Sequence, residues 1–354
     1  MSLQLKQISK TVGAHTHIYP TDVELQPGML NTLLGTTLSG KTTLMQLMAG
    51  LDAPSTGEIW FNGKNVTHVP VQKRNVSMVY QQFINYPMMN VFDNIASPLR
   101  VARYQAADIK QRVGDVAELL RISELLDRKP SELSGGQQQR CAMARALVKE
   151  SDLILLDEPL ANLDFKLREE LRDELPRLLS ERDCVAVYAT TEPTEAVLLG
   201  GCAAAMHEGR IAQFGPTSDI YRRPQSLISA QVFSEPPINV AEVEHRDGWV
   251  HLSDSVSWAA QGEAAGLKNG RYTFAIRPHH VSPSAQGVGV PIDAVVEVAE
   301  LSGSESVIHF SAFERPWISQ SHGVHPYRAG EHVKMFAQVE HGFYFDTAGA
   351  LVAA

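Results

Sequence analysis

The sequence contains few cysteines and no cysteine or histidine pattern that is typical of a structural metal. Its three cysteines, Cys141, Cys184 and Cys202, lack the spacing of a disulfide framework or of a zinc site. They indicate a reduced, cytosolic protein in which each thiol packs in the core. The thirteen histidines also lack zinc spacing, and the adjacent His279 and His280 would point to opposite faces of a strand. We therefore expect no zinc centre.

Long hydrophobic runs and basic clusters are also missing. The apolar windows at residues 153–156 and 197–206 are shorter than the roughly 20 residues that a membrane-spanning helix needs. Lys6 and Lys10 interrupt any signal-peptide pattern after Met1. A net charge of −9 without a Lys/Arg run argues against nucleic acid as a partner.

The pattern of elements predicts two domains in these 354 residues. Up to about residue 238, strands alternate with amphipathic helices, which is typical of an α/β domain. Pro176 is expected to bend or end the helix predicted over residues 166–179. Residues 239–354 instead show short alternating segments separated by Gly, Asn and Ser turns, which predicts a small all-β barrel.

Residues 35–43 match the phosphate-loop pattern G-x-x-x-x-G-K-[ST]. A strand is expected before the loop and a helix after it, so a polyphosphate would lie at a helix N-terminus. Lys41 would reach the β- and γ-phosphates, and the Thr42 hydroxyl would ligate Mg²⁺. The nucleotide-binding candidates are Gly35, Thr36, Thr37, Leu38, Ser39, Gly40, Lys41, Thr42 and Thr43.

A second motif follows the apolar run at residues 153–156. Such a run predicts a central parallel strand buried on both faces. Asp157 and Glu158 end the strand, and open α/β sheets bind ligands at that edge. Asp157 is the candidate metal ligand, and Glu158 is the candidate base that orients the attacking water.

Residues 133–140 read Leu-Ser-Gly-Gly-Gln-Gln-Gln-Arg. With the two motifs above, this segment resembles the signature of ATP-binding-cassette (ABC) ATPases. The resemblance implies a phosphate-loop ATPase domain over residues 1–238, with a helical subdomain at about 88–150, ATP and Mg²⁺ as ligands, and a D-loop at residues 160–164. It makes Gln81 a ligand of the metal and of the γ-phosphate. It also implies that the signature acts across a dimer, through Ser134, Gly135, Gly136 and Gln137.

Three further segments, residues 209–215, 220–224 and 274–278, resemble the carbohydrate-uptake branch of this family. That branch implies an oligonucleotide-binding-like accessory barrel over residues 239–354, which serves dimer contacts and regulation. It implies two membrane permease subunits, contacted through the Q-loop region, and a solute-binding protein that acts indirectly. The expected location is peripheral, at the cytoplasmic face of the inner membrane.

Two positions depart from the family pattern. Thr191 stands where the family usually has the switch histidine, and it offers one neutral hydrogen bond without a proton relay. Val12 stands where an aromatic residue usually stacks on adenine. His17 or Tyr19 could replace that stacking, and the sequence leaves the adenine contact open.

These departures indicate a dimer of two different ATPase subunits, in which the partner keeps the histidine. Residues 191–193 and 199–201, with 82–86 in the Q-loop, resemble the atypical ATPase of bacterial glycerol importers. An ATPase of DNA repair or translation would show a coiled-coil insertion or tandem cassettes, and neither is present. A regulatory nucleotide-binding subunit with little hydrolysis of its own stays open as the alternative.

Overall fold

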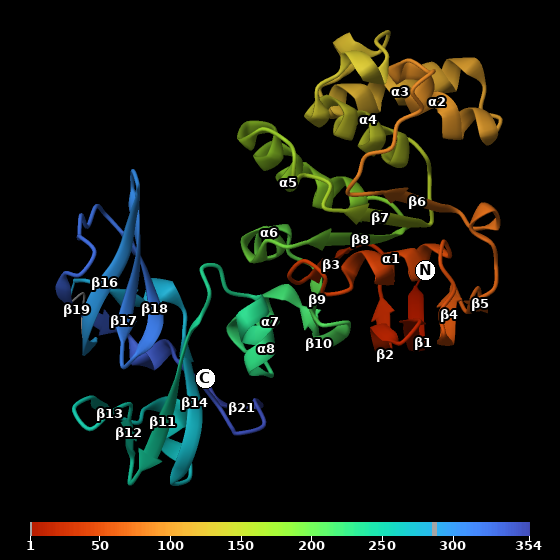
Figure 1. The fold of residues 1–354 in the computed structure, drawn as a ribbon. Coiled ribbons are helices and arrows are strands. Elements are labelled where there is room, and N and C mark those ends of the chain that lie inside the picture. The colour runs from red at the N-terminus through yellow and green to blue at the C-terminus, as the bar shows by residue number, and fades with distance from the viewer. Residues whose placement is uncertain (1, 285–288) are drawn as a thin grey trace. The chain divides into compact units, whose positions relative to one another are not determined.

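The computed structural model describes residues 2–284 and 289–354. The chain divides into two compact units, Met1–Ser218 and Asp219–Ala354, and each is described by itself (Figure 1). The sequence places the domain boundary at residue 238 instead, and that boundary stays a prediction. Within the described ranges, no helix is both long and apolar enough to span a membrane.

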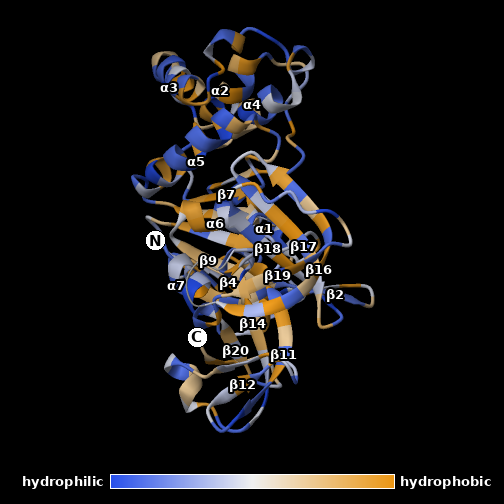
Figure 2. Cartoon of the chain, turned by 90° about the vertical axis from the view of Figure 1, so that its left-hand side faces the viewer, coloured by the Kyte–Doolittle hydropathy of each residue, from blue (hydrophilic) through white to orange (hydrophobic). Residues whose placement is uncertain are grey.

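A six-stranded sheet forms the centre of the first unit, in the order β10-β9-β3-β8-β7-β6. Its strands are β3 (Leu30–Leu34), β6 (Val76–Val79), β7 (Leu153–Asp157), β8 (Val185–Thr190), β9 (Cys202–His207) and β10 (Arg210–Pro216). All pairings are parallel except that of β10 with β9. Every residue of β3, β7 and β8 is buried, as expected for parallel strands covered on both faces. In Figure 2 the colour of apolar residues is frequent on the strands near the label β7.

A smaller antiparallel sheet packs over helix α1 (Lys41–Ala49). It has the order β2-β1-β4-β5 and consists of β1 (Leu3–Val12), β2 (His15–Leu25), β4 (Thr56–Phe61) and β5 (Lys64–Asn65). Leu5 and Ile8 of β1 share one core with Leu44 and Met45 of α1 and with Leu155 of β7. This core fixes the helix N-terminus against the carboxyl ends of the central strands.

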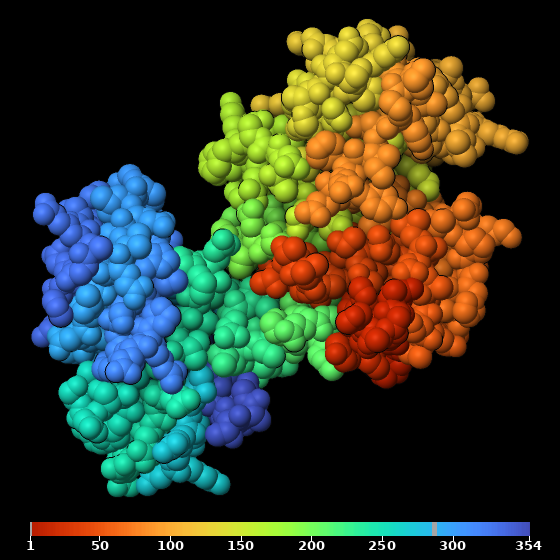
Figure 3. Space-filling model, in the orientation of Figure 1, coloured from red at the N-terminus to blue at the C-terminus, as the bar shows by residue number. Residues whose placement is uncertain are grey.

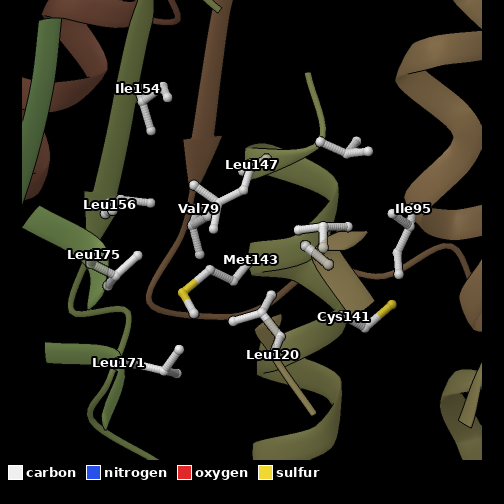
Figure 4. Close-up of a cluster of buried hydrophobic side chains, with 14 of the residues drawn as sticks. Val79, Ile95, Leu120, Cys141, Met143, Leu147, Ile154, Leu156, Leu171 and Leu175 are labelled. Atoms are coloured by element: carbon white, nitrogen blue, oxygen red, sulfur yellow. The ribbon is translucent and has the colours of Figure 1, made fainter. Parts of the chain in front are cut away.

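Three helices of the first unit pack against one another: α2 (Val91–Val101), α3 (Ala106–Leu119) and α4 (Gly135–Leu147). Their atoms form one group at the top of Figure 3. Ile109 and Val113 of α3 are buried, as the helical period of the sequence predicts. Ile95, Cys141 and Met143 belong to the cluster that joins these helices to the central sheet (Figure 4).

The remaining helices are α5 (Phe165–Ser180), α6 (Pro193–Leu199), α7 (Thr217–Arg222) and α8 (Leu227–Val232). Pro176 does not end α5, although a proline removes one helical hydrogen bond. The helix continues to Ser180 because Leu175 and Leu179, on either side of the proline, are both buried in the core.

The second unit contains α8 and, from residue 239 on, two β-sheets. The six-stranded sheet, in the order β13-β12-β11-β14-β20-β21, consists of β11 (Asn239–Arg246), β12 (Trp249–His251), β13 (Ser257–Ala259), β14 (Gly270–Ile276), β20 (Phe343–Phe345) and β21 (Leu351–Ala353). The five-stranded sheet, in the order β15-β19-β16-β17-β18, consists of β15 (Val281–Ser282), β16 (Val290–Ser302), β17 (Glu305–Ala312), β18 (Arg315–His322) and β19 (His332–Ala337).

The five-stranded sheet nearly closes on itself. The hydroxyl of Ser319 on β18 donates to the carbonyl of Val281 on β15 at 2.6 Å, which joins its two edge strands. Trp258, Phe274 and Trp317 contribute the large side chains of the shared core. The predicted fold class, an α/β phosphate-loop domain followed by a small barrel-like all-β domain, is confirmed.

Candidate active site

The phosphate loop connects the end of β3 to the first residue of α1. Gly40 precedes the helix in the left-handed region, at φ 101°. Lys41 is largely buried, and its ammonium group donates to the carbonyls of Gly35 at 2.8 Å and Thr36 at 3.1 Å. Burial lowers the pKa of Lys41, and the nearby carboxylates of Glu158 and Asp157 oppose that shift. The first turn of α1 contains no acidic residue, so its N-terminus is open to an anion.

Oxygen-bearing side chains from three segments meet beside this loop. The Thr42 hydroxyl donates to Asp157 Oδ2 at 2.7 Å, although the two residues are 115 positions apart. Gln81, which follows β6, donates its amide N–H to Glu158 Oε2 at 2.9 Å, so its amide oxygen is not used in that bond. Burial raises the pKa of Asp157, while the Thr42 hydrogen bond and Lys41 lower it. Hydroxyl, carboxylate and amide oxygens are the ligands that Mg²⁺ prefers, so these residues fit the metal.

Glu158 has an unusual backbone conformation for a residue with a side chain, at φ 47°. Its N–H donates to the carbonyl of Ala189 at 3.0 Å, and its carboxylate lies 4.0 Å from the Lys41 ammonium. The pKa of Glu158 is raised, mainly because the carboxylate is partly buried. Left-handed backbone at a non-glycine residue is found preferentially at functional sites, where the surrounding structure holds it in place.

Lys41, Thr42, Gln81 and Glu158 line a cleft of about 560 Å³, a size that suits a nucleotide, and Asp157 is bonded to Thr42 without lining the cleft itself. Its lining consists of His15, Thr16, His17, Tyr19, Thr37, Leu38, Gly40, Lys41, Thr42, Thr43, Gln81, Glu158, Glu208 and Gly209. Val12, one candidate for the adenine contact, is not part of this lining and has 54% of its surface exposed. His17 and Tyr19 do line the cleft, and the Tyr19 ring stacks with the Arg210 guanidinium at 3.5 Å.

The sequence reasoning missed the turn at Glu208 and Gly209. The N–H of Gly209 donates to the carbonyl of Ser39 at 2.9 Å, and its carbonyl accepts from Tyr19, so the turn supports both the phosphate loop and β2. An acidic residue followed by glycine between two strands predicts a tight turn. Nothing in that pattern indicates contact with a ligand.

Thr191 and the signature residues lie outside this cleft. Thr191 directly follows β8 and is exposed. Ser134 caps α4, because Ser134 and Gln137 exchange hydrogen bonds between side chain and backbone. Ser134 and Gly135 are exposed, and the chain does not bring them to its own phosphate loop. The structure therefore gathers the phosphate loop, Gln81, Asp157 and Glu158 into one site, without the signature.

Comparisons with known proteins identify the family. The family described as "ABC transporter" matches residues 19–161. The chain is 37% identical to the trehalose/maltose import ATP-binding protein MalK of Thermococcus litoralis, over 87% of each chain. It belongs to the ABC transporter family. It is also 36% identical to the sn-glycerol-3-phosphate import ATP-binding protein UgpC of Yersinia pestis, over 87% of this chain and 86% of that protein.

Solved structures agree with this assignment. The dimeric structure of MJ0796, a bacterial ABC transporter cassette, aligns with a TM-score of 0.56 and 25% identity, over 61% of this chain and 98% of the other. This ABC protein is an importer-type ATPase that uses ATP with Mg²⁺. The comparisons lend no support to the alternative, a regulatory nucleotide-binding subunit with little hydrolysis of its own.

Proposed function

We propose that this ABC protein is the ATP-hydrolysing subunit of a bacterial importer for a carbohydrate or polyol, with glycerol as the solute. Lys41, Thr42 and Glu158 line one cleft, and Asp157 is bonded to Thr42, which supports the hydrolytic part of the proposal. The relatives' names refer to trehalose, maltose and sn-glycerol 3-phosphate, which are all polyhydroxylated solutes. The preference for glycerol rests on the atypical segments at residues 82–86, 191–193 and 199–201.

The candidate catalytic and metal-binding residues have separate tasks in this proposal. The N–H groups of the phosphate loop and the Lys41 ammonium bind the β- and γ-phosphates. Thr42, Asp157 and Gln81 would hold Mg²⁺, which supplies charge stabilisation to the phosphates when bound. Glu158 orients a water molecule and accepts its proton at a carboxylate oxygen. The water oxygen bonds to the γ-phosphorus as the bond to the β–γ bridging oxygen breaks, and ADP and phosphate leave.

The signature would complete the site of a second ATPase subunit. Ser134, Gly135, Gly136 and Gln137 lie at the exposed N-terminus of α4, where a helix can bind the γ-phosphate that the partner holds. Thr191 provides at most a short, neutral donor at this chain's own site. We infer a non-identical partner whose switch histidine makes its site the faster one.

Membrane attachment would be peripheral, at the cytoplasmic face of the inner membrane. The segment after Gln81 exposes large apolar side chains, with Ile84, Tyr86 and Met88 exposed by 58%, 47% and 85%. Large exposed apolar side chains close together in one segment are typical of an interaction site. Two permease subunits would cover this segment, and a solute-binding protein would deliver the solute to them from the other side.

Solute uptake by whole cells tests the proposal. A strain that lacks this gene is complemented with the wild type or with Glu158→Gln, and uptake of labelled glycerol, glycerol 3-phosphate and maltose is measured. We expect the wild type to restore glycerol uptake fully and Glu158→Gln to restore only part of it, because the partner's faster site stays intact. Restored uptake of another solute would refute glycerol as the substrate but keep the importer. Unchanged uptake of all three would refute the importer for these solutes.

A further inference from the structure

Charged and hydroxyl side chains next to Thr191 form a network of ion pairs and hydrogen bonds. Arg168 on α5 forms an ion pair with Glu192 and a second one, at 3.5 Å, with Glu195. Glu195 is only 4% exposed, and it accepts a hydrogen bond from the Thr190 hydroxyl. That hydroxyl also accepts from the N–H of Glu192 at 3.0 Å. One guanidinium therefore joins two carboxylates, one at the N-cap and one in the first turn of α6.

The end of β8, which leads into the loop that carries Thr191, also forms hydrogen bonds with the phosphate loop and with Glu158. The carbonyl of Thr190 accepts from the N–H of Gly35, the first residue of the phosphate loop, at 3.4 Å. The carbonyl of Ala189 accepts from the N–H of Glu158 at 3.0 Å. A shift at the end of β8 would therefore displace the phosphate loop and Glu158 together.

Arg168 also lies close to the segment that precedes α5. Asp164 caps this helix, since its carboxylate accepts from the N–H of Leu167 at 3.1 Å. The N–H of Arg168 donates to the carbonyl of Asp164 at 2.9 Å, which places Arg168 one turn from residues 160–164. Movement of that segment would reach the end of β8 through this side chain.

We propose that Arg168 is a positioning residue for ATP hydrolysis, because it holds the end of β8 and Thr191 in register with Gly35 and Glu158. The inference rests on the proposed function of the cleft. Arg168 does not line that cleft, so it acts on the reaction only through the loop. A planar guanidinium can bridge two carboxylates, which a lysine ammonium reproduces only in part.

Steady-state ATP hydrolysis by the purified complex tests this role, with Arg168→Met and Arg168→Lys compared to the wild type. In all of them the catalytic glutamate of the partner ATPase is replaced by glutamine, so that only this chain's site is measured. We expect Arg168→Met to lower kcat by about 10–100-fold, because small displacements of reacting groups slow catalysis steeply. KM for Mg-ATP should stay within about twofold, since the phosphate loop keeps its own contacts, and Arg168→Lys should recover part of kcat. The matched control is Arg177→Met on the same helix, where the Arg177 side chain is 85% exposed and forms an ion pair with the exposed Glu181. An unchanged kcat in Arg168→Met, or a loss shared by Arg177→Met, would overturn the proposal.

A second network variant, Glu192→Gln, keeps the test decisive if Arg168→Met unfolds. Glu192→Gln removes a partner that is 43% exposed, and we expect it to lower kcat without changing the melting temperature by more than a few degrees. Combined with Arg168→Met, it should add no further loss, and additive losses would contradict a shared network. Glu158→Gln separates the two claims. If it leaves hydrolysis intact, the proposed function fails; if it stops hydrolysis while the network variants do not, only the role of Arg168 fails.

Discussion

Gly40 allows a test of how closely the phosphate loop depends on backbone geometry. At φ 101° an alanine would adopt left-handed backbone, which costs about 1–2 kcal/mol. Its Cβ would also stand 2.8 Å from Ile18 Cδ1, and 3.3 Å from both Gly209 Cα and the His17 carbonyl. Ile18 is 1% exposed and has little room to move, so the overpacking adds about 1–3 kcal/mol.

Gly63 is the matched control for Gly40→Ala. It lies in the same unit at φ 72°, and an added Cβ there would meet nothing within 4 Å. We therefore expect Gly63→Ala to lower the free energy of unfolding by the backbone term alone, about 1–2 kcal/mol. Gly40→Ala should lower the melting temperature by several degrees more, at about 2–4 °C for each kcal/mol.

Thermal unfolding with and without Mg-ATP measures both effects. Ligand at 100 times its Kd stabilises a protein by about 2.7 kcal/mol, which is easily seen as a rise in melting temperature. We expect this rise to persist in Gly63→Ala and to disappear in Gly40→Ala, because the helix N-terminus can no longer approach the phosphates. Equal melting temperatures and equal ATP shifts in the two variants would refute the reasoning.

Four other predictions concern single residues. Lys41→Ala should weaken ATP binding by the isolated chain in calorimetry, because the buried cation that faces the phosphates is lost. Thr191→His should raise the turnover of this chain's own site in a steady-state assay, and an unchanged rate would show that the side chain at this position does not limit hydrolysis. Gly135→Val should stop hydrolysis at the partner's site while leaving this chain's ATP affinity unchanged. The chain itself has room for the side chain, since a Cβ at Gly135 would stand 3.9 Å from Phe83, an ordinary contact. Lost ATP affinity would contradict an action across the dimer. Burial raises the pKa of Cys141 to about 11, so this thiol should resist alkylation at neutral pH until the chain unfolds, and fast native labelling would contradict its place in the core.

The phosphate loop could be predicted because its chemistry is local. Gly35, Gly40 and Lys41 act at fixed spacing, between a strand and a helix that hydrophobic patterns reveal. The contact between Thr42 and Asp157 is of another kind, since 115 positions separate them. The sequence reasoning assigned both to one metal only through the general rule that ligands bind at the carboxyl ends of parallel strands and through family resemblance.

Other features depend on geometry that one sequence does not contain. The pairing of β1 with β2 shifts register at several points, between Leu5 and Ile8 among others, so spacing from Val12 does not tell which side chains reach the cleft. The turn at Glu208 and Gly209 enters the cleft only because β9 and β10 pair beside β2. Arg168 and its carboxylate partners look like surface charges of amphipathic helices until the fold places Glu195 in a buried position.

The subunit composition of the native complex tests the central claim most directly. The chain is tagged, purified with its complex from membranes in mild detergent, and analysed by native mass spectrometry. We predict one copy of this chain together with one different ABC ATPase that has histidine at its switch position, and two permease subunits. Two copies of this chain with no second ABC ATPase would contradict the division of labour between two unequal sites.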